Sequence, residues 1–384
     1  MPLNSISPID GRYEKYTSVL SSFFSEKALM QYRVIVEGEY LIALSLSRKT
    51  ALRKFSGAEI KKIRNLYEFS LTDFEKIKNI EKTTNHDVKA VEYFLKEKLY
   101  KTSLKNCLEW IHFGLTSYDI NTPARGMMMS DALEQIIIPK IDQIIKGIES
   151  LAKKFKGLSM LSRTHGQSAS PTTFGKEMKV FATRLEKQTK ILKNIKISAK
   201  FSGATGNWNA HVSAYPKVDW VLFSQNFIKQ LNQNRKIKLE LNLPTTQIDS
   251  HDREAEIFDC LRRINTILMG FNQDMWHYIS DEWIMQKLKS GEIGSSAMPH
   301  KINPINFENS EGNLGLANAL LNFFSNKLPI SRLQRDLSDS TVERNFGSAF
   351  AYSLIAYESL LEGLSKIEVN KNKNDFIPAG QKDL

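Results

Sequence analysis

The sequence predicts an all-α protein, an elongated bundle of several long helices. Its longest helical pattern covers residues 252–289 and repeats apolar residues alternately four and three positions apart, which places them along one side of a helix. At 1.5 Å per residue this helix would be roughly 55 Å long. That exceeds the width of a small domain, so its apolar side should pack against equally long helices. Few stretches show the two-residue alternation that is typical of strands.

The same spacing recurs and defines a predicted central long-helix domain, residues 106–366. Further helical patterns cover residues 137–155, 174–200 and 340–366. Pro139 lies inside the first of them and should kink or restart the helix, because proline lacks a backbone N–H. Residues 1–105 read as a more irregular, mostly helical N-terminal domain, and residues 367–384 lose the periodicity and read as a tail. The central domain is expected to be the oligomer core, although a monomeric bundle would show the same spacing.

The net charge of the 384 residues is +11, so nucleic-acid binding has to be weighed. The lysines alternate with apolar positions along the helical patterns, however, as in residues 187–193. They therefore form solvated faces instead of one basic patch, and we expect no nucleic-acid partner. A basic field would still attract an anionic substrate.

Composition also bears on the compartment. No stretch approaches eighteen consecutive apolar residues, and the first residues lack the basic and apolar regions of a secretory signal. Cys107 and Cys260 are far apart in the sequence and suit a reducing environment. We expect no membrane span and a cytoplasmic location.

One loop carries the densest set of reactive side chains. Residues 294–304 read Gly-Ser-Ser-Ala-Met-Pro-His-Lys-Ile-Asn-Pro, a composition that does not pack as a regular helix. A serine hydroxyl is a poor base by itself and needs a cation or backbone N–H groups beside it. Lys301 and the loop amides would supply them to Ser295, and Ser296 and Asn303 are candidate donors to a substrate. The alternative is a polar surface loop in which Ser295 caps a helix.

Two histidines lie in short polar segments. His165 belongs to the turn 162–167, between two helical patterns, and its ordinary pKa of about 6.5 suits proton transfer near neutrality. His86 is flanked by Asn85 and Asp87, which can fix its tautomer and orientation. A structural role is the alternative for each histidine.

Arg335, Ser340 and Arg344 are candidate anion binders. Ser340 and Arg344 are four positions apart and face the same side at the start of a predicted helix, where an N-terminus favours anions. Arginine suits bidentate contact with phosphate. The alternative is a capped helix with surface salt bridges.

The string at 294–304 and its continuation to Asn313 resemble the signature of the fumarase/aspartase superfamily, whose members eliminate fumarate from succinyl-type substrates. The resemblance runs from about Ser7 to about Val369 and is carried by several separate motifs in order. It implies the elongated helical bundle of that superfamily, with a small helical N-terminal domain, and a homotetramer with shared active sites. Relatives usually continue into a third helical domain. This chain ends at Leu384, so we expect that C-terminal domain to be largely missing.

The resemblance also implies roles for the candidate residues. Ser295 would be the base that removes a proton next to a carboxylate, with Lys301 supporting it, and His165 would protonate the departing nitrogen with the help of His86. The implied substrate contacts are Arg12, Tyr13, Asn85, Asp87, Thr116, Ser117, Thr164, Gln247, Ser296, Asn303, Asn309, Arg335, Ser340 and Arg344. No cofactor and no metal are expected, since residues 251–254 resemble a metal cluster only loosely.

The phosphate-type arginines narrow the expected substrate. The motif around Arg344 resembles the branch of the superfamily that acts on succinyl nucleotides. The implied reaction is elimination of fumarate from N6-succinyl-AMP and from succinyl-aminoimidazole-carboxamide ribotide, in purine nucleotide biosynthesis. Two alternatives stay open: another fumarate-releasing lyase, such as an argininosuccinate lyase, and a truncated, inactive homologue.

Overall fold

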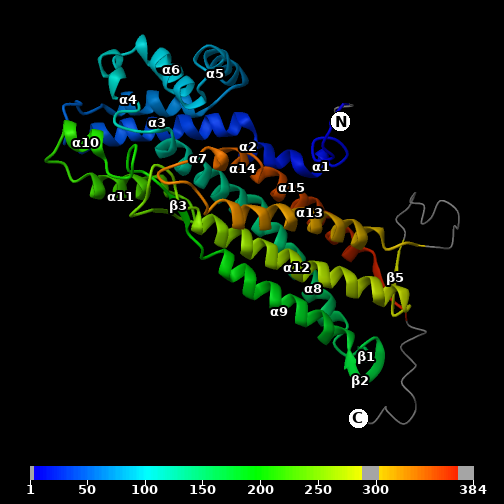
Figure 1. Cartoon of the computed structure of the whole chain (residues 1–384). Helices are drawn as coiled ribbons and strands as arrows, with labels where there is room; N and C mark the ends of the chain where they lie inside the picture. Colours follow the sequence, from blue (N-terminus) through cyan, green and yellow to red (C-terminus); the bar gives the residue numbers. More distant parts are fainter. Residues whose placement is uncertain (1–3, 288–301, 371–384) are drawn as a thin grey trace.

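Long helices lie side by side and form an elongated bundle, as the sequence predicts (Figure 1). The structure, a computed structural model, describes residues 4–287 and 302–370. The bundle helices are α8 (Ile138–Lys154), α9 (Phe174–Leu192), α12 (Asp252–Ser280), α13 (Ile305–Lys327) and α15 (Phe346–Ser365). Each of them packs against the next in this order, and α15 packs back against α8. The predicted apolar sides therefore face a common interior.

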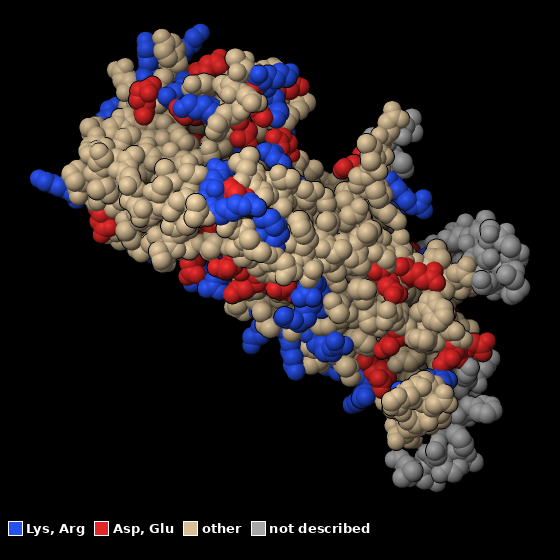
Figure 2. Space-filling model, viewed as in Figure 1, with Lys and Arg blue, Asp and Glu red and all other residues tan. Residues whose placement is uncertain are grey.

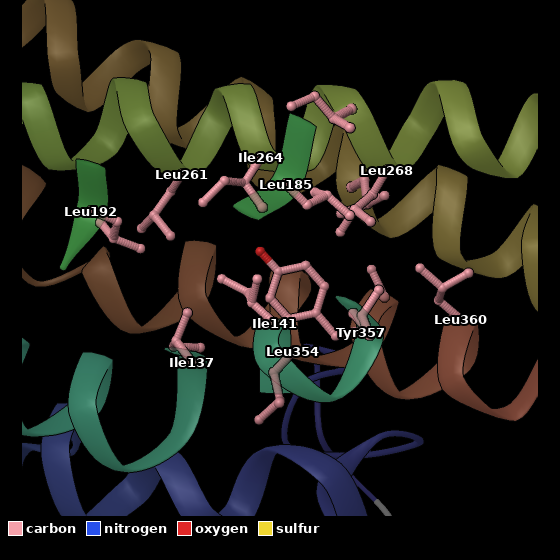
Figure 3. Packing of buried hydrophobic residues seen from close by; sticks show 14 of the residues in the cluster. Ile137, Ile141, Leu185, Leu192, Leu261, Ile264, Leu268, Leu354, Tyr357 and Leu360 are labelled. Carbon is pink, nitrogen blue, oxygen red and sulfur yellow. The ribbon is translucent and has the colours of Figure 1, made fainter. Parts of the chain in front are cut away.

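The bundle core consists of aliphatic and aromatic side chains from all five of these helices. Ile141 of α8, Leu185 of α9, Ile264 of α12 and Leu354 of α15 are buried in this one cluster (Figure 3). Burying one such side chain contributes about 1.5–3 kcal/mol. The buried hydroxyl of Tyr357 donates to Asn265 Oδ1 at 2.6 Å, so this polar group inside the core is satisfied.

Three predicted helices differ from expectation. The helix expected over 174–200 ends at Leu192, and the chain then enters β3 (Ile197–Ala199). The helix expected over 252–289 ends at Ser280, because Glu282 takes a left-handed φ of 60° and the chain then enters β5 (Ile284–Gln286). Strand β5 pairs antiparallel with β6 (Ile367–Val369), so the end of the helical pattern is held in a two-stranded sheet. The pattern over 340–366 is divided between α14 (Ser338–Glu343) and α15.

Pro139 restarts a helix, as predicted. It stands in the first turn of α8, and its missing N–H interrupts the helical hydrogen-bond pattern at that point. The π-helical turn η4 (Leu133–Ile137) joins α8 to the preceding α7 (Ser117–Ala132). The two helices thus continue one another with a local change of pitch.

The N-terminal region forms a second hydrophobic core. The helices of this region are α1 (Glu14–Thr17), α2 (Ser21–Phe24), α3 (Glu26–Ser47), α4 (Gly57–Arg64), α5 (Leu71–Thr84) and α6 (Asp87–Tyr100), with 3₁₀ turns η1 (Ser18–Leu20), η2 (Asn65–Tyr67) and η3 (Lys105–Trp110). The second core begins with α3, whereas Leu20 and Phe24 pack in the bundle core. Tyr40 and Phe94 of this region pack in one cluster with Phe227 of α11 (Trp220–Leu231) and with residues of α7. Later segments thus help to close the N-terminal core, and the division at residue 105 stays a prediction.

Short elements complete the fold. Strand β1 (Ser159–Thr164) pairs antiparallel with β2 (Gln167–Thr173) at the far end of the bundle, and β3 (Ile197–Ala199) pairs parallel with β4 (Leu239–Leu241) (Figure 1). Helix α10 (Asn209–Ala214) lies between β3 and α11 in the sequence.

Charged side chains of both signs are interspersed over the surface that Figure 2 shows, without one continuous basic patch. No helix within residues 4–287 and 302–370 is long and apolar enough to cross a membrane.

Candidate functional site

The predicted anion-binding residues Arg335, Ser340 and Arg344 lie in helix α14 or close to its ends. Ser340 lies in α14 and Arg344 directly follows it, while Asp339 and Glu343 of the same segment are buried. The Arg344 guanidinium lies 3.3 Å from Glu26 and 3.4 Å from Asp87. The fold therefore brings Arg344 and Asp87 together, although they are far apart in the sequence.

Asp87 begins helix α6 and lies at the centre of a charged group. Its carboxylate accepts from Arg33 Nη2 at 2.8 Å, and the Arg33 side chain is 1% exposed. Burial raises the pKa of Asp87, but the charge of Arg33 and its hydrogen bond outweigh burial and lower it to about 2. Asp87 is thus a carboxylate at neutral pH and holds Arg33 in place.

His86 and Asn85 sit in the turn between α5 and α6. Asn85 ends α5 with a left-handed φ of 49°. His86 is exposed and caps α6, because its Nδ1 accepts from the backbone N–H of Lys89 at 3.1 Å. This hydrogen bond leaves Nε2 as the protonated nitrogen of the neutral ring.

Gln247 and Arg335 meet beside the start of α7. Arg335 Nη1 donates to Gln247 Oε1 at 3.4 Å, and Gln247 Nε2 donates to the carbonyl of Ala204 at 2.9 Å. The guanidinium also lies over the ring of Tyr118, 4.6 Å from its centroid. Helix α7 starts next to this contact: Thr116 is its N-cap and Ser117 its first residue.

Three further predicted contacts, Tyr13, Asn303 and Asn309, lie near the start of α13. The Asn309 amide donates to the hydroxyl of Tyr13 at 2.9 Å, which ties α13 to the N-cap of α1. Asn303 precedes α13 and is partly buried, and Arg12 is exposed. Ser295, Ser296 and Lys301 lie outside the described residues.

His165 occupies the turn of the β1–β2 hairpin with a left-handed φ of 52°, and both it and Thr164 are exposed. Arg163 supports this turn: it donates to the Gly166 carbonyl at 2.8 Å and pairs with Asp281 at 2.9 Å. The hairpin lies at one end of the long helices, whereas α6 and α14 lie toward the other (Figure 1). A single chain therefore does not bring His165 next to His86 or Arg344.

One buried cluster offers donor atoms of the kinds that bind metals. Atoms of Asp249, His251 and Glu254 lie within 4.8 Å of one another. Both carboxylate oxygens of Asp249 already accept hydrogen bonds, one from Ser198 Oγ at 2.6 Å and one from the backbone N–H of His251 at 2.8 Å. Burial, then the charge of Asp249, raises the pKa of Glu254, which favours its protonated, non-ligating form. The absence of a metal from the site stays a prediction.

Sequence reasoning missed the buried charges beneath these residues. Asp119 and Lys200 are fully buried and pair at 2.7 Å, and Arg125 pairs with Glu343 between α7 and α14. Lys200 directly follows the short strand β3, whose three residues are all buried, and no clear signal in the sequence marks it. Arg125 and Glu343 carry no such signal either.

Comparisons with known proteins extend these observations. A family model described as "Lyase" matches residues 11–318, and one described as "Adenylosuccinate lyase C-terminal" matches residues 331–376. The chain is 50% identical over 377 residues to an adenylosuccinate lyase of Dictyostelium discoideum, which covers 96% of this chain and 80% of the relative. It is 48% identical to that of Escherichia coli K12, with 96% and 80% covered.

Solved structures share the fold at low sequence identity. A fumarate lyase from Mesorhizobium sp. BNC1 superposes with a TM-score of 0.74 at 16% identity, over 93% of this chain and 77% of that chain. A 3-carboxy-cis,cis-muconate lactonizing enzyme from Pseudomonas putida gives a TM-score of 0.75 at 19% identity, over 94% and 78%. These likenesses confirm the predicted architecture.

The fold and the ordered motifs thus define a lyase of the fumarase/aspartase superfamily. Within it, the chain belongs to the adenylosuccinate lyase family, which consists of carbon–nitrogen lyases.

One expectation needs correction. The C-terminal domain was expected to be largely missing, but the C-terminal family model matches residues 331–376. That match begins before α14 and covers α15 and β6. The periodicity of α15 continues the bundle without a break, so helical spacing could not mark where the C-terminal family region begins.

Proposed function

We propose that this chain eliminates fumarate from N6-succinyl-AMP, giving AMP, and from succinyl-aminoimidazole-carboxamide ribotide, giving the free carboxamide ribotide. Membership of the adenylosuccinate lyase family supports both reactions. The observation that carries the proposal is the grouping of Arg335, Ser340 and Arg344 around one short helix, which suits a nucleotide phosphate. A succinyl substrate without phosphate, such as argininosuccinate, would not use this group.

The chemistry is a β-elimination with separate base and acid. Ser295 removes the proton from the carbon next to a carboxylate, with Lys301 favouring the alkoxide, while donors such as Asn303 and Ser296 stabilise the carbanion. His165 protonates the departing nitrogen as the carbon–nitrogen bond breaks and the double bond of fumarate forms. Both roles rest on the motifs.

The remaining predicted residues bind and orient the substrate. The phosphate of the substrate is bound by Arg335, Ser340 and Arg344, together with Gln247 and the start of α7. His86, which caps α6, contacts the substrate and supports His165. The other proposed substrate contacts are Arg12, Tyr13, Asn85, Asp87, Thr116, Ser117, Thr164 and Asn309.

We further propose a homotetramer whose active sites combine segments of different subunits. The support is geometric: the His165 hairpin and the Arg344 group lie toward opposite ends of one chain (Figure 1). The enzyme is proposed to work in the cytoplasm without a cofactor. Cys107 and Cys260, both buried and unpaired with each other, suit a reducing compartment.

Fumarate release from each succinyl nucleotide tests the proposal. The purified chain is separated by size, and each fraction is assayed. Ser295→Ala and His165→Ala should keep the fold and lose turnover by about a hundredfold or more. Mixing His165→Ala with Arg344→Ala chains under conditions that allow subunit exchange should restore part of the activity if sites are shared. An inert wild-type tetramer would favour the inactive-homologue alternative.

A further inference from the structure

We propose that Tyr118 is a positioning residue that holds both halves of the phosphate-binding group, through its ring on Arg335 and through its hydroxyl on α14. This inference rests on the function proposed above. Tyr118 is fully buried on α7, between the segment that carries Arg335 and the helix that precedes Arg344. It therefore lies behind the substrate-facing side chains.

The hydroxyl of Tyr118 anchors α14. It donates to the Asp339 carboxylate and lies 3.3 Å from Glu343 Oε2. Burial, followed by the charge of Asp339, raises the pKa of Tyr118, so the hydroxyl keeps its proton and acts as a donor. Asp339 also accepts the backbone N–H of Ser340 at 2.6 Å. These hydrogen bonds therefore connect the Tyr118 hydroxyl, through Asp339, to Ser340, which is proposed to bind the phosphate.

Helix α14 depends on these contacts for its position. It has six residues, too few to be stable as an isolated helix. Asp339 and Glu343 are four positions apart and both face α7, where Arg125 donates to Glu343. Ser340 and Arg344 have the same spacing one residue later, so the inner contacts with α7 fix the direction in which these two side chains point.

The ring of Tyr118 supports the other half of the group. The Arg335 guanidinium lies 4.6 Å from the ring centroid, a distance typical of a cation held over an aromatic face. Gln247 contacts the guanidinium at 3.4 Å. Phosphate binding needs both arginines to be held in place. Tyr118 contacts Arg335 directly, and it contacts helix α14, which directly precedes Arg344.

A positioning role predicts a specific kinetic change. Tyr118→Phe keeps the ring and removes the hydroxyl, so it should raise KM for succinyl-AMP about tenfold, the expected effect of losing one hydrogen bond to a charged group, and change kcat less than about threefold. The inhibition constant of inorganic phosphate should rise in parallel, while that of fumarate should stay the same. Tyr118→Leu also removes the ring and should raise KM further.

Two comparisons separate positioning from general destabilisation. Tyr357→Phe removes a buried hydroxyl that bonds Asn265 at 2.6 Å in the bundle core, so it should lower the melting temperature without changing KM. Asp339→Asn should raise KM as Tyr118→Phe does. The double variant should be less impaired than the sum of the two single changes, because both act on the same contact.

The outcomes are distinguishable from failure of the proposed function. If the wild-type protein releases no fumarate and phosphate does not bind, the proposed function fails and this inference fails with it. If the wild-type enzyme is active and Tyr118→Phe loses stability while its KM and phosphate inhibition stay unchanged, only the positioning role is overturned. If Tyr118→Phe does not assemble, Asp339→Asn decides the question by the same measurements.

Discussion

The buried pair of Asp119 and Lys200 should be among the most sensitive points of the fold. Lys200 Nζ donates to Asp119 Oδ1 at 2.7 Å, and the exposed fraction of both side chains is 0%. The carboxylate also accepts backbone N–H groups of Ser202 at 2.8 Å, Gly203 at 3.1 Å and Thr116 at 2.8 Å. One carboxylate thus holds the start of α7 and the loop after β3.

The two single substitutions should differ in cost. Breaking a buried ion pair from one side costs about 3–5 kcal/mol, because the remaining charge is left without its partner. Lys200→Met should fall at the low end, since Asp119 keeps its backbone donors. Asp119→Asn should fall at the high end, since it leaves a buried ammonium and weakens the hydrogen bonds of all three N–H groups. Burial already lowers the pKa of Lys200, although the charge of Asp119 opposes this.

Urea unfolding followed by circular dichroism measures these costs at one protein concentration, because assembly contributes to stability. The double variant Asp119→Asn/Lys200→Met should be no less stable than Asp119→Asn alone. Lys196→Met is the matched control: it removes a surface pair with Glu240, at 2.6 Å and 54% and 42% exposed, and should change stability little. A Lys200→Met protein as stable as this control would refute the reasoning.

Two other substitutions test local features of the site. The pKa of Asp87 is lowered from 3.8 to about 2, so its contribution to stability is complete above pH 3.8 and is lost as the pH falls through 2. Over this pH range, the unfolding free energy of the wild-type protein should fall by up to about 2 kcal/mol more than that of Asp87→Asn. Parallel curves of stability against pH for the two proteins would contradict this. Gly206 has a φ of 79°, and a Cβ there would lie 2.1 Å from the Thr245 carbonyl oxygen next to the Gln247 segment. Gly206→Ala should therefore lower the unfolding free energy, measured in urea, by at least about 1 kcal/mol and raise KM. Gly57→Ala is the control and should leave stability unchanged, because a Cβ at Gly57 has no atom within 4 Å. Equal stabilities of the two variants would contradict this prediction.

The sequence was a good guide where one local pattern governs structure. The three-and-four spacing identified four of the five bundle helices and missed α13, while Pro139 marked the interruption before α8. It was a poorer guide to helix ends, because the longest pattern ends at Glu282, where the backbone is left-handed and the following strand pairs with residues far ahead in the chain. Such pairings depend on tertiary contacts that periodicity does not contain.

The sequence by itself determined the helical class, the family and the identity of the candidate site residues, since apolar spacing and short motifs are local properties. Only the tertiary structure decided which residues meet. It joined Asp87 to Arg344 and Arg335 to Gln247, and it placed the His165 hairpin toward the opposite end of the helices. It also revealed Tyr118, Asp119 and Lys200 behind the site. Their importance comes from burial and from partners up to 225 positions away, as between Tyr118 and Glu343, which no local pattern records.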